Sequence, residues 1–181
     1  AEALAWNAKD EALAHIAAFE GWWPATAAFV RARLAVGQKD LDGAVDELEK
    51  ACRILRRSPW EVQPTTDRGM AVLTAVAKLK PEYALRLYEA MMEPFALSYL
   101  ESKRRSELLN ISGLISPEKQ EAVLLRWFEP SPPVNLSLLT MRSAAYKATG
   151  NPLAAKAERD LAAFKAGRRK TVADFVAGYE K

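Results

Sequence analysis

The residues of this chain best suited to acid–base or nucleophilic chemistry are one histidine and one cysteine. The 181-residue sequence holds His15 and Cys52 and no others of these types. A nucleophilic site needs a serine or cysteine within hydrogen-bond reach of a base, and no recognisable motif ties either residue to such a partner. We expect His15 to be a helical surface residue and Cys52, between Ala51 and Arg53 on another helix, to be a buried packing thiol. The sequence therefore predicts no catalytic residue and no enzyme.

Metal and phosphate sites are not predicted either. One histidine and one cysteine far apart in the chain cannot supply the usual nitrogen and sulfur ligands of a zinc site. The acidic run DLDGAVDELE, from Asp40 to Glu49, has the charges of a calcium loop but not its spacing of ligands and glycine, so we interpret Asp40 as a turn or capping residue. The eight glycines are scattered and form no phosphate loop. We expect no metal and no cofactor.

Three basic clusters could bind phosphates if they shared one face. Yet the formal net charge is only +3, and acidic residues such as Asp46 and Glu107 stand beside the basic ones. Arginines near the end of a helix also offset its dipole, so we expect solvated faces and no nucleic acid partner. An RNA- or DNA-binding helical repeat is the alternative. The clusters are Arg53, Arg56 and Arg57; Lys103, Arg104 and Arg105; and Arg168, Arg169 and Lys170.

Small residues recur at a spacing that predicts pairs of closely crossing helices. Ala32, Ala44 and Ala51 stand in nearly the same relative places as Ser143, Ala155 and Ala162. Each segment reads as a helix of about a dozen residues, a short polar turn and a second helix, which is a helical-hairpin repeat of roughly 34 residues. Half of the residues are hydrophobic, and no long run alternates apolar and polar residues, so we expect an all-α protein.

This pattern resembles the tetratricopeptide repeat (TPR), in which small residues mark the first helix, alanines mark the second and a proline tends to close the unit. The resemblance implies a right-handed α-solenoid of helical hairpins. In residues 25–58 the two helices carry Ala32, Ala44 and Ala51 at the expected places, while Arg56 sits where the closing proline belongs. In the last repeat Gly167 replaces that proline.

We expect one TPR-like domain over residues 1–181. Its units are a partial repeat at 1–24, repeats at about 25–58, 65–98, 103–135 and 136–169, and a C-terminal capping helix at 171–180, for which a frayed tail is the alternative. The proline-bounded segments 58–64 and 129–134 should be rigid connections. Because the first unit lacks most of its first helix and no initiator methionine is present, we expect a fragment of a longer protein.

We expect a non-catalytic protein–protein interaction scaffold of bacterial style, because stacked helical hairpins form a concave groove that can hold a peptide, a partner helix or a partner domain. The groove residues in the TPR register are Phe29, Arg33, Leu73, Val76, Arg104, Glu107, Ile111, Thr140 and Lys147. Trp60, isolated in the first connection, is an expected exposed anchor, whereas Trp23 is expected to fill space between repeats. Phe29, Thr66 and Thr140 stand where carboxylate-gripping donors are wanted, so that specificity is not expected. A second alternative is an assembly appendage of an enzyme outside this fragment.

Partner identity and compartment are left open by the sequence. The longest apolar stretches fall far short of the roughly 20 residues needed to cross a bilayer, so we expect a soluble domain, cytoplasmic or periplasmic. The truncated first unit exposes an apolar end that could pair two copies into a homo-oligomer.

Overall fold

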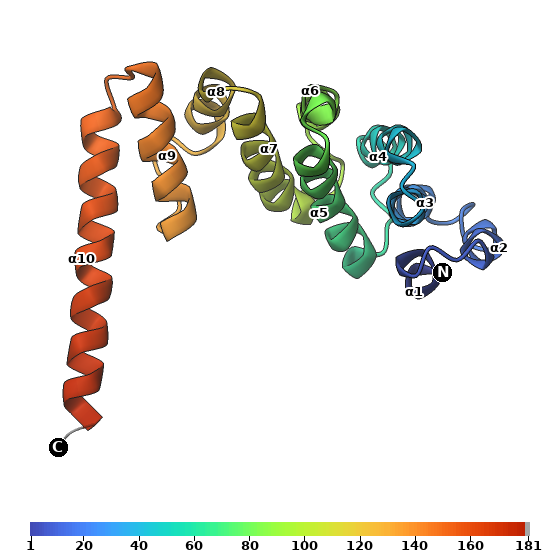
Figure 1. The fold of residues 1–181 in the computed structure, drawn as a ribbon, viewed down its shortest axis with the longest axis horizontal. Helices are drawn as coiled ribbons and strands as arrows, with labels where there is room; N and C mark the ends of the chain where they lie inside the picture. The colour runs from blue at the N-terminus through green and yellow to red at the C-terminus, as the bar shows by residue number, and fades with distance from the viewer. Residues whose placement is uncertain (180–181) are drawn as a thin grey trace. The chain divides into compact units, whose positions relative to one another are not determined.

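The computed structural model describes the backbone of residues 1–179 and the side chains of residues 1–168. This part of the chain is all-helical, as predicted, with ten α-helices and two 3₁₀ helices (Figure 1). The α-helices are α1 (Glu2–Trp6), α2 (Glu11–Ala17), α3 (Pro24–Gly37), α4 (Leu41–Leu55), α5 (Gln63–Leu79), α6 (Ala84–Met91), α7 (Glu101–Ile115), α8 (Pro117–Trp127), α9 (Leu136–Thr149) and α10 (Ala154–Tyr179). The 3₁₀ helices are η1 (Pro81–Tyr83) and η2 (Ser98–Leu100).

Side-chain caps set several helix starts. The Asp40 carboxylate accepts a hydrogen bond from the Gly43 amide at 2.9 Å, which confirms Asp40 as a cap. Ser116 does the same for α8 and Asn135 for α9. At the other end of α9, Gly150 has φ +68°, a left-handed conformation that glycine adopts without a steric cost.

The structure divides into two compact units. The first, Ala1–Ile115, holds α1 to α7, and the second, from Ser116 onward, holds α8 to α10. The predicted third repeat, at about 103–135, therefore contributes α7 to the first unit and α8 to the second. The expectation of one domain placed no boundary at this point.

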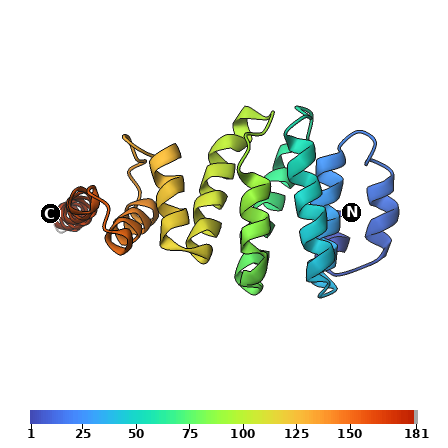
Figure 2. The same ribbon diagram turned by 90° about the horizontal axis from the view of Figure 1, so that it is seen from above.

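In the first unit, neighbouring helices pair, and alternate helices also pack against one another. α3 packs on α4, α5 on α6 and α6 on α7, while α5 lies between α3 and α7 (Figures 1 and 2). Hydrogen bonds join residues of α3, α5 and α7, or of the segments just before these helices. The number of positions between the two partners is nearly the same in each case. The pairs are Thr26 with Val62, 36 positions apart; Arg33 with Arg68, 35 apart; and Thr66 with Tyr99 and Thr74 with Glu107, both 33 apart. A constant offset means that α3, α5 and α7 run in the same direction.

The alanines that suggested crossing helices lie at such a crossing. Ala32, Ala44 and Ala51 are fully buried, and α3 and α4 form the most extensive helix pair of the described residues. Small side chains allow the two backbones to approach closely. Ala12 and Ile16 of the first 24 residues are also fully buried, as expected, and pack against α3 through Ala27.

In the second unit, α8 packs on α9 and α9 packs on α10. Arg142 of α9 is fully buried, and its guanidinium donates to the carboxylates of Glu129 and Asp160. Tyr146 donates a hydrogen bond to Glu129 at 3.0 Å. The buried charge of Arg142 is thus matched by two acidic side chains.

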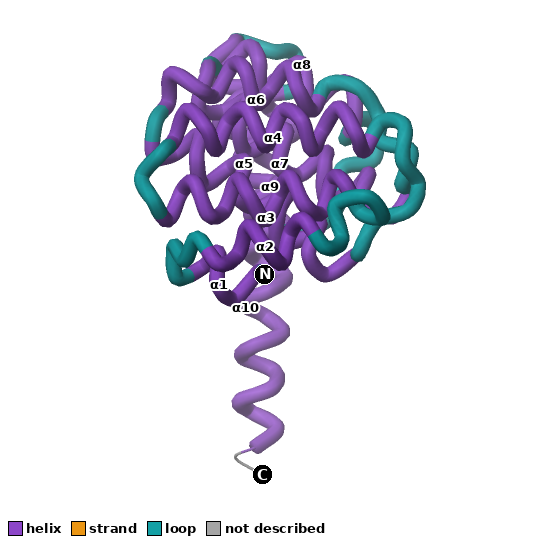
Figure 3. The backbone as a smooth tube through the Cα atoms, turned by 90° about the vertical axis from the view of Figure 1, so that its right-hand side faces the viewer, coloured by secondary structure: helices purple, strands orange, loops and turns teal. Residues whose placement is uncertain are grey.

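The expectation that a separate helix begins at Thr171 is wrong. Figure 3 shows α10 as one uninterrupted helix, and it continues through Gly167 and Thr171 to Tyr179. A glycine within a helix costs only about 1 kcal/mol relative to alanine, and no proline follows it to stop the helix. Residue 180 of the expected capping helix and the side chains after residue 168 lie outside the described part.

Among the described residues, no helix has both the length and the apolar character needed to cross a bilayer.

Candidate functional site at an aromatic edge

Most side chains predicted to line the concave groove are buried in this structure. Seven are buried: Phe29, Arg33, Leu73, Val76, Arg104, Glu107 and Ile111. In the first unit, α3, α5 and α7 turn these register positions toward neighbouring helices. A partner laid on the surface cannot reach them without a rearrangement of the helices.

Phe29 and Arg33 show why α3 has little free surface. A Cβ atom added to Gly69 of α5 would lie 2.3 Å from the Phe29 ring, so the ring occupies the space that this glycine leaves. Arg33 donates to Glu2 of α1 at 2.7 Å, and its guanidinium lies 4.3 Å from the centre of the Trp6 ring. α1 and α5 therefore cover the side of α3 that was expected to face a groove.

Arg104 and Glu107 are held in place by partners within the protein. Arg104 donates to both oxygens of Glu101, at 2.7 and 2.8 Å, and to the Met91 carbonyl at 2.5 Å. Glu107 accepts from Thr74 at 2.5 Å and pairs with Lys103 at 2.9 Å. Burial raises the pKa of Glu101, but the hydrogen bonds and charges of its neighbours, Arg104 first, hold it below its usual value. Lys103 and Arg104 of the second basic cluster therefore form ion pairs with acidic side chains of the same protein.

The first basic cluster borders a polar pocket, and only one side chain of the third cluster is described. Arg53 and Arg56 line a polar pocket of about 170 Å³ with Arg86, Glu49 and Glu89. Arg56 lies 3.2 Å from Glu93, and Arg86 donates to Glu49 and Asp46. Acidic side chains thus alternate with the basic ones along α4 and α6. In the third cluster, Arg168 is exposed, and the side chains of Arg169 and Lys170 lie outside the described part.

Three of the predicted contact residues are exposed. Trp60 is 77% exposed in the first unit. Thr140 and Lys147 are exposed on α9 of the second unit, seven positions apart and so on one helix face. Thr140 donates to the Leu136 carbonyl at 2.7 Å, and Lys147 pairs with Glu158 at 3.2 Å.

Exposed aromatic side chains mark the starts of the three parallel helices of the first unit. Trp22 and Trp23 precede α3, Trp60 precedes α5, and Tyr99 precedes α7. Their exposed fractions are 78, 42, 77 and 39%. We call these four residues the aromatic edge. The sequence analysis missed Tyr99 and took Trp23 as filler, although Trp22, Trp60 and Tyr99 recur at steps of 38 and 39 residues, a signal that could have found them.

Glu61 fixes the connection that carries Trp60. Its carboxylate accepts hydrogen bonds from the amides of Ala25 and Thr26, at 3.1 and 2.9 Å, and from the Thr26 hydroxyl at 2.7 Å. These amides belong to the first turn of α3, whose own N-cap residue, Trp23, makes no side-chain hydrogen bond. Trp60 is therefore exposed on a connection that is tied to α3 through the residue beside it.

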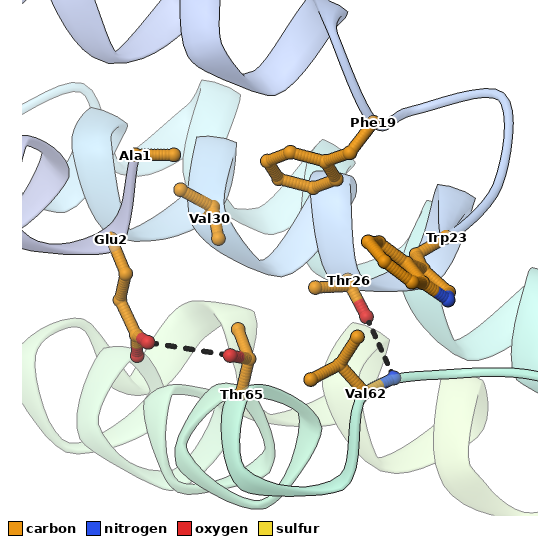
Figure 4. Close-up of a pocket in the computed structure, with 8 residues that line it drawn as sticks. All are labelled: Ala1, Glu2, Phe19, Trp23, Thr26, Val30, Val62 and Thr65. Carbon is orange, nitrogen blue, oxygen red and sulfur yellow. Dashed lines mark hydrogen bonds between the residues drawn. The ribbon is translucent and has the colours of Figure 1, made fainter.

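A small pocket of about 190 Å³ lies beside the aromatic edge (Figure 4). Its apolar wall includes Phe19, Trp23, Val30 and Val62, and the Phe19 and Trp23 rings lie 6.2 Å apart between centres. At its polar side, Thr65 donates to Glu2 at 3.3 Å, as the dashed line in Figure 4 shows. The hydrogen bond from Arg68 is the main reason that the pKa of Glu2 lies below its usual value. This volume suits one apolar side chain rather than a large cofactor.

The two residues best suited to acid–base or nucleophilic chemistry, His15 and Cys52, lie outside the aromatic edge. His15 is exposed on α2, and Cys52 is fully buried, both as expected. Burial raises the pKa of the Cys52 thiol to about 12, so the nucleophilic thiolate is scarce at neutral pH. In the part of the chain that the structure describes, no three His, Cys, Asp or Glu side chains gather as a metal site.

Comparisons with protein-family models, with curated proteins and with solved structures find no match to this chain.

Proposed function

We propose that this chain is a non-catalytic protein-interaction module built as a TPR-like solenoid of helical hairpins, and that its aromatic edge and the adjoining pocket hold the partner. The offset of 33 to 36 residues between hydrogen-bonded positions of α3, α5 and α7 supports the repeat architecture. It agrees with the roughly 34-residue period of such repeats. Stacked hairpins of this period form right-handed solenoids.

The observation that carries the proposal is the exposure of Trp60 on an anchored connection. Tryptophan is enriched among the residues that dominate binding energy, and clustered exposed apolar side chains mark interaction sites. A fixed connection also reduces the conformational entropy that is lost when a partner binds. Trp60 is therefore already presented for contact in the free protein.

The open face of α5 and α7 is a weaker candidate than the aromatic edge. Apart from Leu79 at the end of α5, its exposed residues are mostly small or polar: Ala71 and Ala75 on α5, and Ser102 and Ser106 on α7. Such side chains give a partner backbone room to approach but bury little apolar area. We therefore place the partner's anchoring contacts at the aromatic edge.

The test is a quantitative affinity capture from a cell extract with the wild-type chain and two matched variants. Trp60→Ala removes the proposed anchor, whereas Trp6→Ala removes another exposed tryptophan, 65% exposed, outside the aromatic edge. We expect proteins that the wild type and Trp6→Ala retain and that Trp60→Ala loses. Nuclease treatment and high salt should leave their recovery unchanged. If recovery depends on nucleic acid instead, the RNA- or DNA-binding alternative is favoured and the proposal fails.

A further inference from the structure

We propose that the aromatic edge binds a proline-rich segment in the polyproline II conformation. This inference rests on the proposed function and names the chemistry of the partner. Two features of the edge carry it: the spacing of the helices that present the aromatic rings, and the indole N–H groups that its three tryptophans leave free.

The spacing follows from the packing of α3, α5 and α7. Packed helices lie about 8–10 Å apart, and α5 packs on both α3 and α7, so we infer a similar spacing for the aromatic residues that precede these three helices. A polyproline II segment advances about 3.1 Å per residue with three residues per turn, or about 9 Å per turn. Prolines three positions apart therefore match successive aromatic positions. A segment of roughly seven residues spans the edge from Trp22 through Trp60 to Tyr99.

The hydrogen-bonding groups are also complementary. An indole N–H is only a donor, and among the described residues the indoles of Trp22, Trp23 and Trp60 donate no hydrogen bond. Proline has no N–H, so a proline-rich backbone offers mainly carbonyl acceptors, and the polyproline II conformation leaves them unpaired. Donor-only rings thus face an acceptor-rich ligand.

The two carboxylates beside the edge, Glu61 and Glu2, already have partners within the protein. Glu61 is occupied by the amides and hydroxyl of the α3 start, and Glu2 is occupied by Arg33 and Arg68. Neither carboxylate needs a cation from the partner. The neighbouring pocket, walled by Phe19, Trp23 and Val62, can take a pyrrolidine ring or another compact apolar side chain.

An amphipathic helix is a poorer match. Residues seven positions apart on a helix are also about 10 Å apart, so spacing alone does not separate the two ligands. A helix, however, uses most of its carbonyls in its own hydrogen bonds and offers the indole donors mainly side-chain acceptors. The free indole N–H groups therefore favour the polyproline II segment.

The experiment is calorimetric titration of the full chain with three uncharged peptides of equal length: decaproline, a glycine–serine peptide and a helical alanine–glutamine peptide. We expect decaproline to bind saturably and the other two not to bind. Trp60→Ala should weaken decaproline binding about tenfold or more, as for a hot-spot aromatic residue. Trp60→Phe keeps a ring face and loses the donor, so its loss should be intermediate. Trp6→Ala should bind like the wild type.

Circular dichroism checks that each variant is folded, and Trp22→Ala replaces Trp60→Ala if the latter is not. Decaproline that binds no better than the glycine–serine peptide overturns the proposal, as does equal weakening by Trp6→Ala. If only the helical peptide binds, and depends on Trp60, the ligand class is wrong and the interaction module stands. If neither the peptides nor the captured proteins depend on Trp60, the interaction module fails as well.

Discussion

At the scale of single residues, the Glu61 carboxylate serves as a remote cap for α3. We expect Glu61→Ala to lower the free energy of unfolding by about 1–2 kcal/mol, because two amides in the first turn of α3 lose their acceptor. Urea unfolding followed by circular dichroism measures the change. Glu89→Ala is the control, since the Glu89 side chain is exposed and makes no hydrogen bond or ion pair among the described residues. Equal effects of the two substitutions would contradict a capping role.

Cys52 gives a second prediction at this scale. Its thiol keeps its proton until the pH approaches about 12, so it should react with an alkylating reagent at pH 8 only when the protein unfolds. Above the ordinary thiol pKa of 9.0, the unfolded state loses this proton while the folded state keeps it. The contribution of Cys52 to stability is therefore full below pH 9 and declines as the pH rises toward 12.

Mass spectrometry of the alkylated protein, with and without denaturant, measures this reactivity. Rapid labelling of the folded chain at pH 8 would show that the thiol is accessible. In alkaline unfolding experiments, Cys52→Ala should remove the part of the pH dependence that belongs to this thiol.

At the scale of elements, two exposed glycines test whether α10 is continuous. A methyl group added to Gly167 or Gly150 meets no atom within 4 Å, but Gly167 lies within α10 and Gly150 has φ +68°. Gly167→Ala should stabilise the protein by about 0.5–1 kcal/mol, and Gly150→Ala should destabilise it by about 1 kcal/mol. Thermal unfolding of both variants shows whether each substitution raises or lowers the stability of the protein. A loss of stability in Gly167→Ala would favour the helix break that the sequence predicted.

The contact of α3 with α5 gives another prediction at this scale. In Gly69→Ala the new methyl group collides with the base of the Phe29 ring, so we expect a loss of about 1–3 kcal/mol although alanine favours helices. Phe29→Leu should cost less in the Gly69→Ala background than in the wild type, because the smaller side chain relieves the collision. A double-mutant cycle measures this coupling, and additive effects would show that the two residues are independent.

The sequence predicted the elements better than the faces that they expose. Recurring alanines predicted the pairing of α3 with α4, and together with the absence of long alternating apolar and polar runs they predicted the all-helical class. The burial of the groove positions could not be predicted from their register, because exposure depends on neighbouring helices: Arg33 is covered by α1, and Phe29 fits over Gly69. Trp60 was found because prolines isolate it in a connection. Tyr99 was missed although its 39-residue step from Trp60 was present in the sequence, because that step differs from the roughly 34-residue repeat period.

At the scale of the whole molecule, the division at Ile115 makes a prediction about folding. Residues 1–115 contain α1 to α7, the fully buried side chains of the α3–α4 pair and the long-range hydrogen bonds that join α3, α5 and α7. They also contain the whole aromatic edge. Because the first unit buries its own core, we expect residues 1–115 to fold alone and to unfold cooperatively.

Circular dichroism during urea unfolding tests this expectation. A helical fragment with a single transition is expected, and it should bind decaproline as the full chain does, since each residue of the aromatic edge lies within it. A fragment without helical signal would show that α8 to α10 are required for the first unit to fold. In that case the third predicted repeat, with α7 and α8 as one hairpin, would describe the folding unit better than the boundary at Ile115.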